Sequence, residues 1–107
     1  MTPDYQTVDA KIAAIEIEMK RIGMWQDEPL KPEQYDFRSA FGADTMAFEQ
    51  WLEFIFIPHV RDMIVTREPF PSESNVAAQA LREFDTSGFD TARLQQLLQE
   101  FDDLHQA

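Results

Sequence analysis

The stretch DTMAFEQWLEFIFIPHV, residues 44–60, decides the fold, because it contains the longest apolar run of the chain. Its large apolar residues are Phe48, Trp51, Leu52, Phe54, Ile55 and Phe56. On a helical wheel they cover more than half of the circumference, and Glu49, Gln50 and Glu53 form a thin polar strip. A helix this apolar must be nearly surrounded. We therefore expect a central helix, with Asp44 as the N-cap that accepts hydrogen bonds from the first free amides.

Pro58 lies inside this apolar region. Proline has no backbone N–H and crowds the carbonyl four residues earlier, so it costs about 3 kcal/mol in an uninterrupted α-helix. Beyond it the apolar positions change to Val60 and Met63, and a straight continuation would turn Asp62 into the core. We therefore expect a kink or break near Ile57, with Pro58 in the first turn of the helix that continues.

Three other segments repeat apolar residues at spacings of three and four, which is typical of one face of a helix. The first should run from about Asp4 to Gly23, the second lies near residues 76–84, and Asp90 should cap the third. Their apolar faces are Val8, Ile12, Ile15, Met19 and Ile22; Val76, Ala77, Ala80, Leu81 and Phe84; and Leu94, Leu97, Leu98, Phe101 and Leu104. We predict an all-α fold: a small antiparallel four-helix bundle with a proline-kinked central helix, in one domain of residues 1–107.

Residues 24–44 separate the first two helices and have no steady period. This segment contains two prolines and four aromatic residues: Trp25, Tyr35, Phe37 and Phe41. A loop of this length is uncommon in a small domain unless it packs or has a function. We expect it to pack across the mouth of the bundle.

The charge of the chain limits its partners. Asp and Glu number 20 against 9 Lys and Arg, which gives a formal net charge of −11. Such a charge repels the phosphates of nucleic acids and of anionic membranes. We expect no direct nucleic-acid binding and no membrane partner, and a basic protein fits the charge better. The N-terminal sequence does not resemble a signal peptide, so a cytoplasmic location is expected.

Catalytic and cofactor motifs are hard to find in this sequence. The chain has no cysteine, and its 3 glycines are too far apart to form a phosphate loop. His59 and Asp62 share one helix face, but no third metal ligand is evident near them. Asp102 is expected on a solvated helix face and His105 at the surface. We expect no enzymatic activity, no metal and no cofactor.

The aromatic content is the remaining feature, with 9 Phe, 2 Trp and 2 Tyr. These residues either fill a small core or stay partly exposed as an interaction surface, since Trp and Tyr are enriched at binding hot spots. The candidate interaction surface comprises Trp25, Glu49, Trp51, Glu53, Phe54, His59 and Arg61. Self-association through the apolar helix is compatible with the same pattern, so a homo-oligomer is left open.

The central stretch resembles the YqcC-like family of small bacterial all-helical proteins of uncharacterised function. The resemblance rests on Asp44-Thr45-Met46, Trp51-Leu52 and Ile57-Pro58, and it extends from about Val8 to Phe101. It implies an all-α bundle with no established enzymatic activity and no known cofactor. Genes of this family often lie beside one for a tRNA pseudouridine synthase, which implies an accessory role in RNA modification.

Two hypotheses follow for the function. The first is a non-catalytic interaction module whose acidic surface and aromatic patch bind a basic protein, such as a tRNA-modifying enzyme. The alternative is a small-molecule-binding protein with a pocket between the kinked helix and the aromatic loop. In that case His59 and Arg61 would supply the polar contacts.

Overall fold

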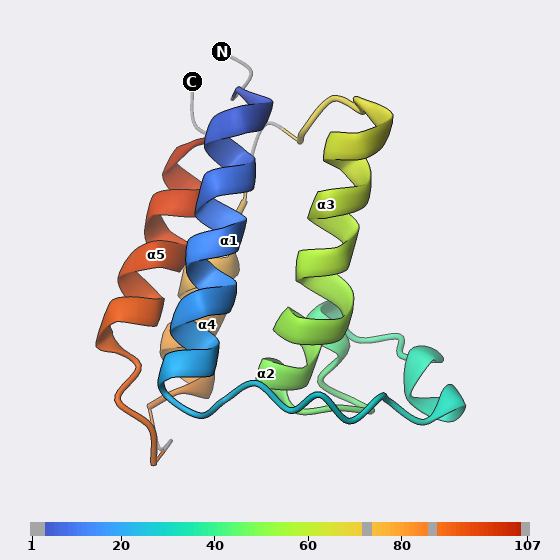
Figure 1. Cartoon of the computed structure of the whole chain (residues 1–107). Coiled ribbons are helices and arrows are strands. Elements are labelled where there is room, and N and C mark those ends of the chain that lie inside the picture. The colour runs from blue at the N-terminus through green and yellow to red at the C-terminus, as the bar shows by residue number, and fades with distance from the viewer. Residues whose placement is uncertain (1–3, 72–73, 86–87, 106–107) are drawn as a thin grey trace.

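The computed structural model describes residues 4–71, 74–85 and 88–105, and all regular elements in these ranges are helical (Figure 1). The α-helices are α1 (Tyr5–Arg21), α2 (Phe48–Trp51), α3 (Ile57–Thr66), α4 (Val76–Glu83) and α5 (Ala92–Asp103). A π-helical segment, η3 (Leu52–Phe56), joins α2 to α3, and two 3₁₀ turns, η1 (Pro32–Tyr35) and η2 (Ala40–Gly42), lie in the preceding loop. The predicted all-α fold is confirmed.

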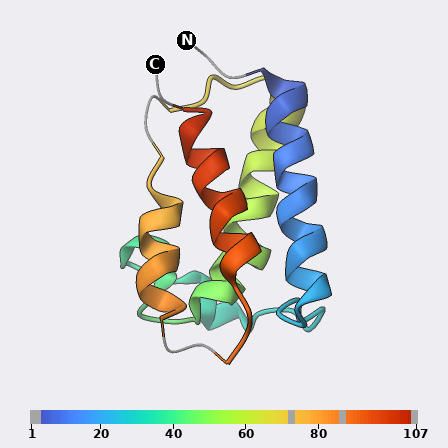
Figure 2. The same cartoon turned by 90° about the vertical axis from the view of Figure 1, so that its left-hand side faces the viewer.

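Four helical rods run alternately in opposite directions: α1, the continuous rod α2-η3-α3, α4 and α5 (Figures 1 and 2). Helix α1 packs against both α5 and α3, and α4 packs against α5. The predicted inner faces supply one hydrophobic cluster, in which Ile12, Ile15 and Leu98 are fully buried. Burial of one such side chain contributes roughly 1.5–3 kcal/mol, so this cluster holds the rods together. Leu81 was predicted to face inward and is instead 63% exposed.

Pro58 does not break the central rod. The five residues before α3 form a π-helical segment, in which the Ile57 N–H donates to the Leu52 carbonyl five residues earlier. Pro58 then lies in the first turn of α3, as predicted, where its missing N–H costs little. The wider π turn accommodates the proline without interrupting the helix.

The central helix begins later than predicted. It begins at Phe48, with Ala47 in the N-cap position, and the side-chain Oε1 of Gln50 accepts the Ala47 N–H at 2.9 Å. Asp44 instead accepts the amides of Arg38 and Ser39 at 2.9 and 3.3 Å. The prediction that Asp44 caps this helix is therefore wrong, because its carboxylate closes a turn of the preceding loop. These amide hydrogen bonds, led by that of Arg38, lower the pKa of Asp44.

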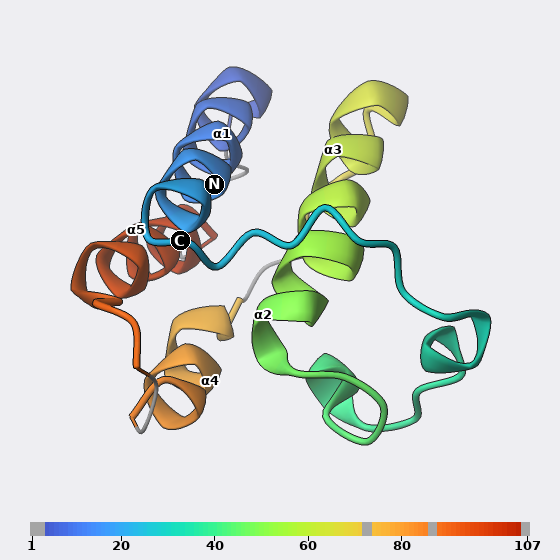
Figure 3. The ribbon, with the colours of Figure 1, turned by 60° about the horizontal axis from the view of Figure 1, so that its bottom comes forward.

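Residues 24–47 cross one end of the bundle and then curve out beyond α2 (Figure 3). Trp25 and Phe41 pack partly against the core, whereas Tyr35 is 51% exposed. Gly42 has a φ of +64°, and a Cβ there would lie 3.2 Å from atoms of both Met46 and Trp51. Glycine suits this close turn, because a larger residue would be strained at this φ and would push against both side chains. The turn brings the centroid of the Phe41 ring to 4.9 Å from that of Trp51.

Two polar residues of α5 and its end are buried, contrary to prediction. Asp102 accepts the N–H groups of Val76 and Ala77 at 3.1 and 2.8 Å and the Ser74 hydroxyl at 2.5 Å. It therefore caps the N-terminus of α4 from a neighbouring helix. His105 is only 4% exposed, and its ring lies 4.7 Å from that of Phe101. Both residues are part of the packed structure and not of a solvated face.

Candidate functional site

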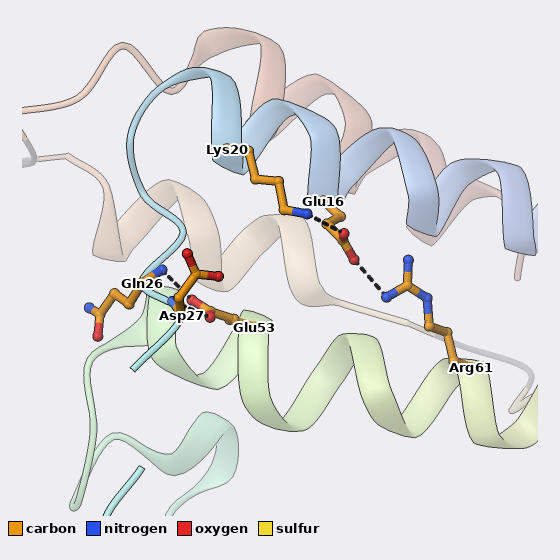
Figure 4. Close-up of polar contacts among 6 residues, drawn as sticks. All are labelled: Glu16, Lys20, Gln26, Asp27, Glu53 and Arg61. Atoms are coloured by element: carbon orange, nitrogen blue, oxygen red, sulfur yellow. Dashed lines mark hydrogen bonds and ion pairs between the residues drawn. The ribbon is translucent and has the colours of Figure 1, made fainter. Parts of the chain in front are cut away.

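The carboxylate of Glu53 fixes the start of the long loop to the central rod (Figure 4). Its Oε1 accepts the Gln26 N–H at 2.8 Å and its Oε2 accepts the Asp27 N–H at 3.2 Å. Asp27 has a φ of +58°, a left-handed conformation that non-glycine residues rarely adopt. Glu53 is only 5% exposed, and burial raises its pKa. Glu53 was predicted on a thin polar strip and in the candidate interaction surface, but it is buried, because its carboxylate turns inward to accept hydrogen bonds from these two amides.

Glu16 joins the first helix to the central rod (Figure 4). Its carboxylate accepts hydrogen bonds from Lys20 Nζ at 2.8 Å and from Arg61 Nη1 at 2.6 Å. The two cations, Lys20 foremost, lower the pKa of Glu16. The Lys20 ammonium also lies 5.0 Å from the centroid of the Trp25 ring. Arg61 and Trp25 therefore both contact side chains of α1. The guanidinium of Arg61 is already paired with a carboxylate of the same chain.

Trp51 and His59 line an apolar cavity of about 240 Å³ that also involves α5. The aromatic rings in its wall belong to Trp51, Phe56, Phe70 and Phe101, together with the imidazoles of His59 and His105. The Trp51 ring stacks against those of Phe48 and Phe56, with centroids 5.8 and 5.4 Å apart. The cavity can hold an organic ring system but brings few polar groups to it.

The candidate interaction residues therefore do not form one surface. Trp51 and His59 line the cavity, whereas Glu53 and Arg61 make their contacts with α1 or the residues just after it. Glu49 and Phe54 are half-buried. Sequence reasoning missed Glu16, Asp102 and His105, whose partners or surroundings depend on the packing of separate helices.

The pocket predicted between the central helix and the aromatic loop is small. The cavity that Phe41, Met46 and Phe48 help to line has a volume of only about 60 Å³. That volume holds a few waters at most and no metabolite. A wider, open depression of about 390 Å³ follows the first turns of α1, but its described lining comes from that helix and its cap alone. The 240 Å³ cavity is the better candidate for an organic ligand.

A catalytic or metal centre has little support in the described residues. His59 and Asp62 are both exposed, and no hydrogen bond joins them in the described ranges. Within the same residues, no cluster of three or more His, Cys, Asp and Glu could hold a metal ion. Nor does any helix of the described chain combine the length and apolar character needed to cross a membrane.

The fold and these contacts define a small acidic all-α bundle with a buried carboxylate at its loop junction. The DUF446 family model, described as "tRNA pseudouridine synthase C", matches residues 7–104, and the chain belongs to this family. An uncharacterized protein of Haemophilus influenzae is 29% identical over 87 residues, which cover 78% of this chain and 76% of that protein.

The sequence and the structure of one Escherichia coli protein, YqcC, confirm the resemblance to the YqcC-like family. The uncharacterized protein YqcC is 26% identical over 73 residues, covering 68% of this chain and 67% of YqcC. The solution NMR structure of YqcC superposes with a TM-score of 0.84 at 24% identity, covering 94% of this chain and 86% of that one. This structural likeness establishes the shared fold.

Proposed function

We propose that this protein is a non-catalytic accessory module that binds a basic surface of a tRNA-modifying enzyme through residues 24–47. The observation that carries the proposal is an acidic loop segment held in a fixed conformation at one end of the bundle. We expect the protein to act in the cytoplasm and to contact protein and not RNA.

The charge of this segment supports a basic partner. Asp27, Glu28, Glu33, Asp36 and Asp44 are exposed there, against two basic residues, Lys31 and Arg38. Elsewhere several cations are already neutralised within the protein: Lys11, Lys20, Arg21 and Arg61 all form ion pairs with carboxylates. With five carboxylates against two cations, the segment itself carries a net charge of −3 out of the −11 of the whole chain. Such a surface attracts basic partners and speeds their association.

The segment is also held in place before any partner binds. Glu53 fixes Gln26 and Asp27, and Asp44 closes the turn at Arg38 and Ser39. Further along, the Thr45 hydroxyl donates to the Gln34 carbonyl at 2.7 Å. A loop that is already ordered loses less conformational entropy on binding, which favours affinity.

The left-handed backbone of Asp27 and Phe41 agrees with a functional segment. Their φ values are 58° and 61°, and neither residue is glycine. Residues in such sparsely populated conformations cost about 1–3 kcal/mol each and cluster at binding sites. The description of the matching family model names a tRNA pseudouridine synthase, which is the enzyme we propose as the first partner to test.

A direct binding measurement with two charge-reversal variants tests this proposal. The purified full chain would be titrated with a purified tRNA pseudouridine synthase C, at low and at high salt. Glu33→Lys/Asp36→Lys reverses two exposed carboxylates in the segment. Asp9→Lys/Glu68→Lys is the matched control, because it changes the net charge equally at two exposed residues outside the segment, one in the first half of α1 and one just after α3. The N-terminus of α1 and the C-terminus of α3 lie at the end of the bundle opposite the loop (Figure 1).

We expect the loop variant to bind about tenfold more weakly at low salt and the control to stay within about twofold of the wild type. High salt should weaken wild-type binding, since it screens exposed charges. Absence of binding by the wild-type chain would refute the proposed partner. Equal losses in the two variants would refute the proposed surface, because only the total charge would then matter.

A further inference from the structure

The 240 Å³ cavity lies on the side of the central rod that faces α5, so it is separate from the acidic loop segment. Its walls are largely aromatic: Trp51, Phe56, Phe70 and Phe101 contribute rings, and Val60 and Met63 contribute aliphatic surface. An apolar cavity of about 150 Å³ holds a benzene ring. This one has room for a planar bicyclic molecule, which would make stacking and edge contacts with the rings.

Hydrogen bonds and ring contacts hold the wall of the cavity in place. Ser74 donates its hydroxyl to the buried carboxylate of Asp102. The Tyr5 hydroxyl donates to the Glu68 carbonyl at 2.8 Å, and the Tyr5 ring lies 5.2 Å from that of Phe70. Phe70 in turn meets His105 edge-on, with centroids 5.8 Å apart. The cavity is therefore bounded by side chains with fixed partners on two helices and the connecting segment.

His105 supplies a polar atom that a ligand in the cavity can use. Its Nδ1 lies 2.9 Å from the Phe101 carbonyl oxygen, which only accepts hydrogen bonds. Nδ1 must therefore carry the proton, and in the neutral ring Nε2 is an acceptor. Nε2 has no hydrogen-bond partner among the described residues. No buried side-chain nitrogen or oxygen of those residues is left unpaired, so Nε2 must be open to solvent. An open acceptor in the cavity wall can take a hydrogen bond from water or from a ligand that displaces the water.

We propose that the cavity binds a planar aromatic molecule, about the size of two fused rings, that donates one N–H or O–H hydrogen bond to His105 Nε2. The aromatic walls supply most of the affinity by burying the rings. The hydrogen bond sets the orientation and selects molecules with a donor on one edge. This site is independent of the proposed docking segment, so either proposal can hold without the other.

Indole and indene form a matched pair of probes, because they have nearly the same shape and only indole has an N–H donor. Each would be titrated into the isotopically labelled full chain and followed by backbone and side-chain NMR shifts. We expect indole to shift the signals of Trp51, Val60 and Met63 and to bind about fivefold more tightly than indene, the usual net effect of one hydrogen bond.

Two substitutions assign this preference to one atom. His105→Phe keeps a ring in the wall but removes Nε2, so indole should bind no better than indene. Asp62→Asn is the control, because Asp62 is exposed on α3 and does not line the cavity, and the fivefold preference should persist in it. Far-UV circular dichroism would establish that each variant is folded.

Three results would overturn the proposal. They are no binding of either probe to the wild-type chain, shifts centred away from the cavity, and equal affinity for indole and indene. The wild-type comparison needs no substitution, so it decides the question even where a variant fails to fold. A preference that survives in folded His105→Phe would remove His105 from the site.

Discussion

Single carboxylates that accept hydrogen bonds from backbone N–H groups hold much of this structure together. Glu53 and Asp102 are both buried, and each accepts N–H groups from a segment more than 20 residues away in sequence. Each uses both oxygens, one toward each of two successive amides. A carboxylate is the side chain that offers two acceptor atoms in this arrangement. Replacement of such a side chain by the carboxamide of the same shape, Gln for Glu or Asn for Asp, therefore tests these contacts directly.

Glu53→Gln should lower the free energy of unfolding by about 1–3 kcal/mol. Glutamine has one acceptor oxygen, so its NH₂ group would face the amide of Gln26 or that of Asp27, and one buried N–H would lose its partner. Urea unfolding of the variant and the wild type measures the difference. Glu49→Gln, one helical turn earlier and half-buried, is the control and should change stability by less than about 0.5 kcal/mol. Equal effects would mean that the two amides find other partners.

At the scale of elements, the sequence predicts the helices well and their ends less well. Apart from Leu81, which is exposed, the apolar faces of α1, α3, α4 and α5 follow from spacing alone, because burial of one stripe imposes the helical period. The start of the central rod was predicted at Asp44 because aspartate is a good cap, but tertiary contacts use that carboxylate in a loop turn. Local preference was overruled by partners that the local sequence does not reveal.

The candidate site was less predictable than the helices. Trp51 and His59 were singled out from the sequence and do line the cavity, but the cavity lies against α5 and not against the aromatic loop. His105 was missed as a buried residue, because a histidine near a chain end carries no local signal of burial. Its position depends on how Phe70 and Phe101 pack around it. Only tertiary structure brings these rings together.

The start of α4 depends on a residue of α5, which gives a prediction at this scale. Asp102→Asn removes one of the two acceptor oxygens that bind the amides of Val76 and Ala77, so we expect a loss of about 1–3 kcal/mol and fraying of the first turn of α4. Hydrogen exchange of the α4 amides measures the fraying, and urea unfolding measures the stability. Asp103→Asn is the control, since Asp103 is exposed and accepts only from Gln99 on its own helix. Unchanged exchange in α4 would contradict the cap.

At the scale of the whole molecule, the charges should make stability depend on pH. Cationic partners lower the pKa values of Glu16, Glu18 and Glu100, chiefly Lys20, Arg21 and Lys11 respectively. A carboxyl with a lowered pKa in the native state stabilises it fully above the unfolded value of 4.5, and this contribution is lost as the pH falls through the native value. Glu53 acts in the opposite direction, because burial raises its pKa.

We expect these three ion-paired carboxylates to outweigh Glu53, so that stability falls as the pH drops below about 4.5. Urea midpoints measured from pH 6 to lower pH test this. High salt should reduce the acid-dependent loss of stability, because each pair is partly exposed and therefore partly screened. Lys11→Met should remove the part of the acid-dependent loss of stability that comes from Glu100. A urea midpoint that stays constant or rises on acidification would show that protonation of Glu53 and reduced repulsion among carboxylates outweigh the lost ion pairs.

The π-helical segment Leu52–Phe56 is the place where the central rod can lose one residue. A π turn contains about one residue more than an α turn, so deletion of one residue after Glu53 would let the α-helical pattern close. The two ends of the rod would then keep nearly the same relative orientation, and Glu53 could still face Gln26 while Arg61 faced Glu16. The same deletion in a regular α-helical turn would rotate everything beyond it by about 100°. One-residue deletions should therefore be tolerated better within this segment than in the α-helical turns that follow it.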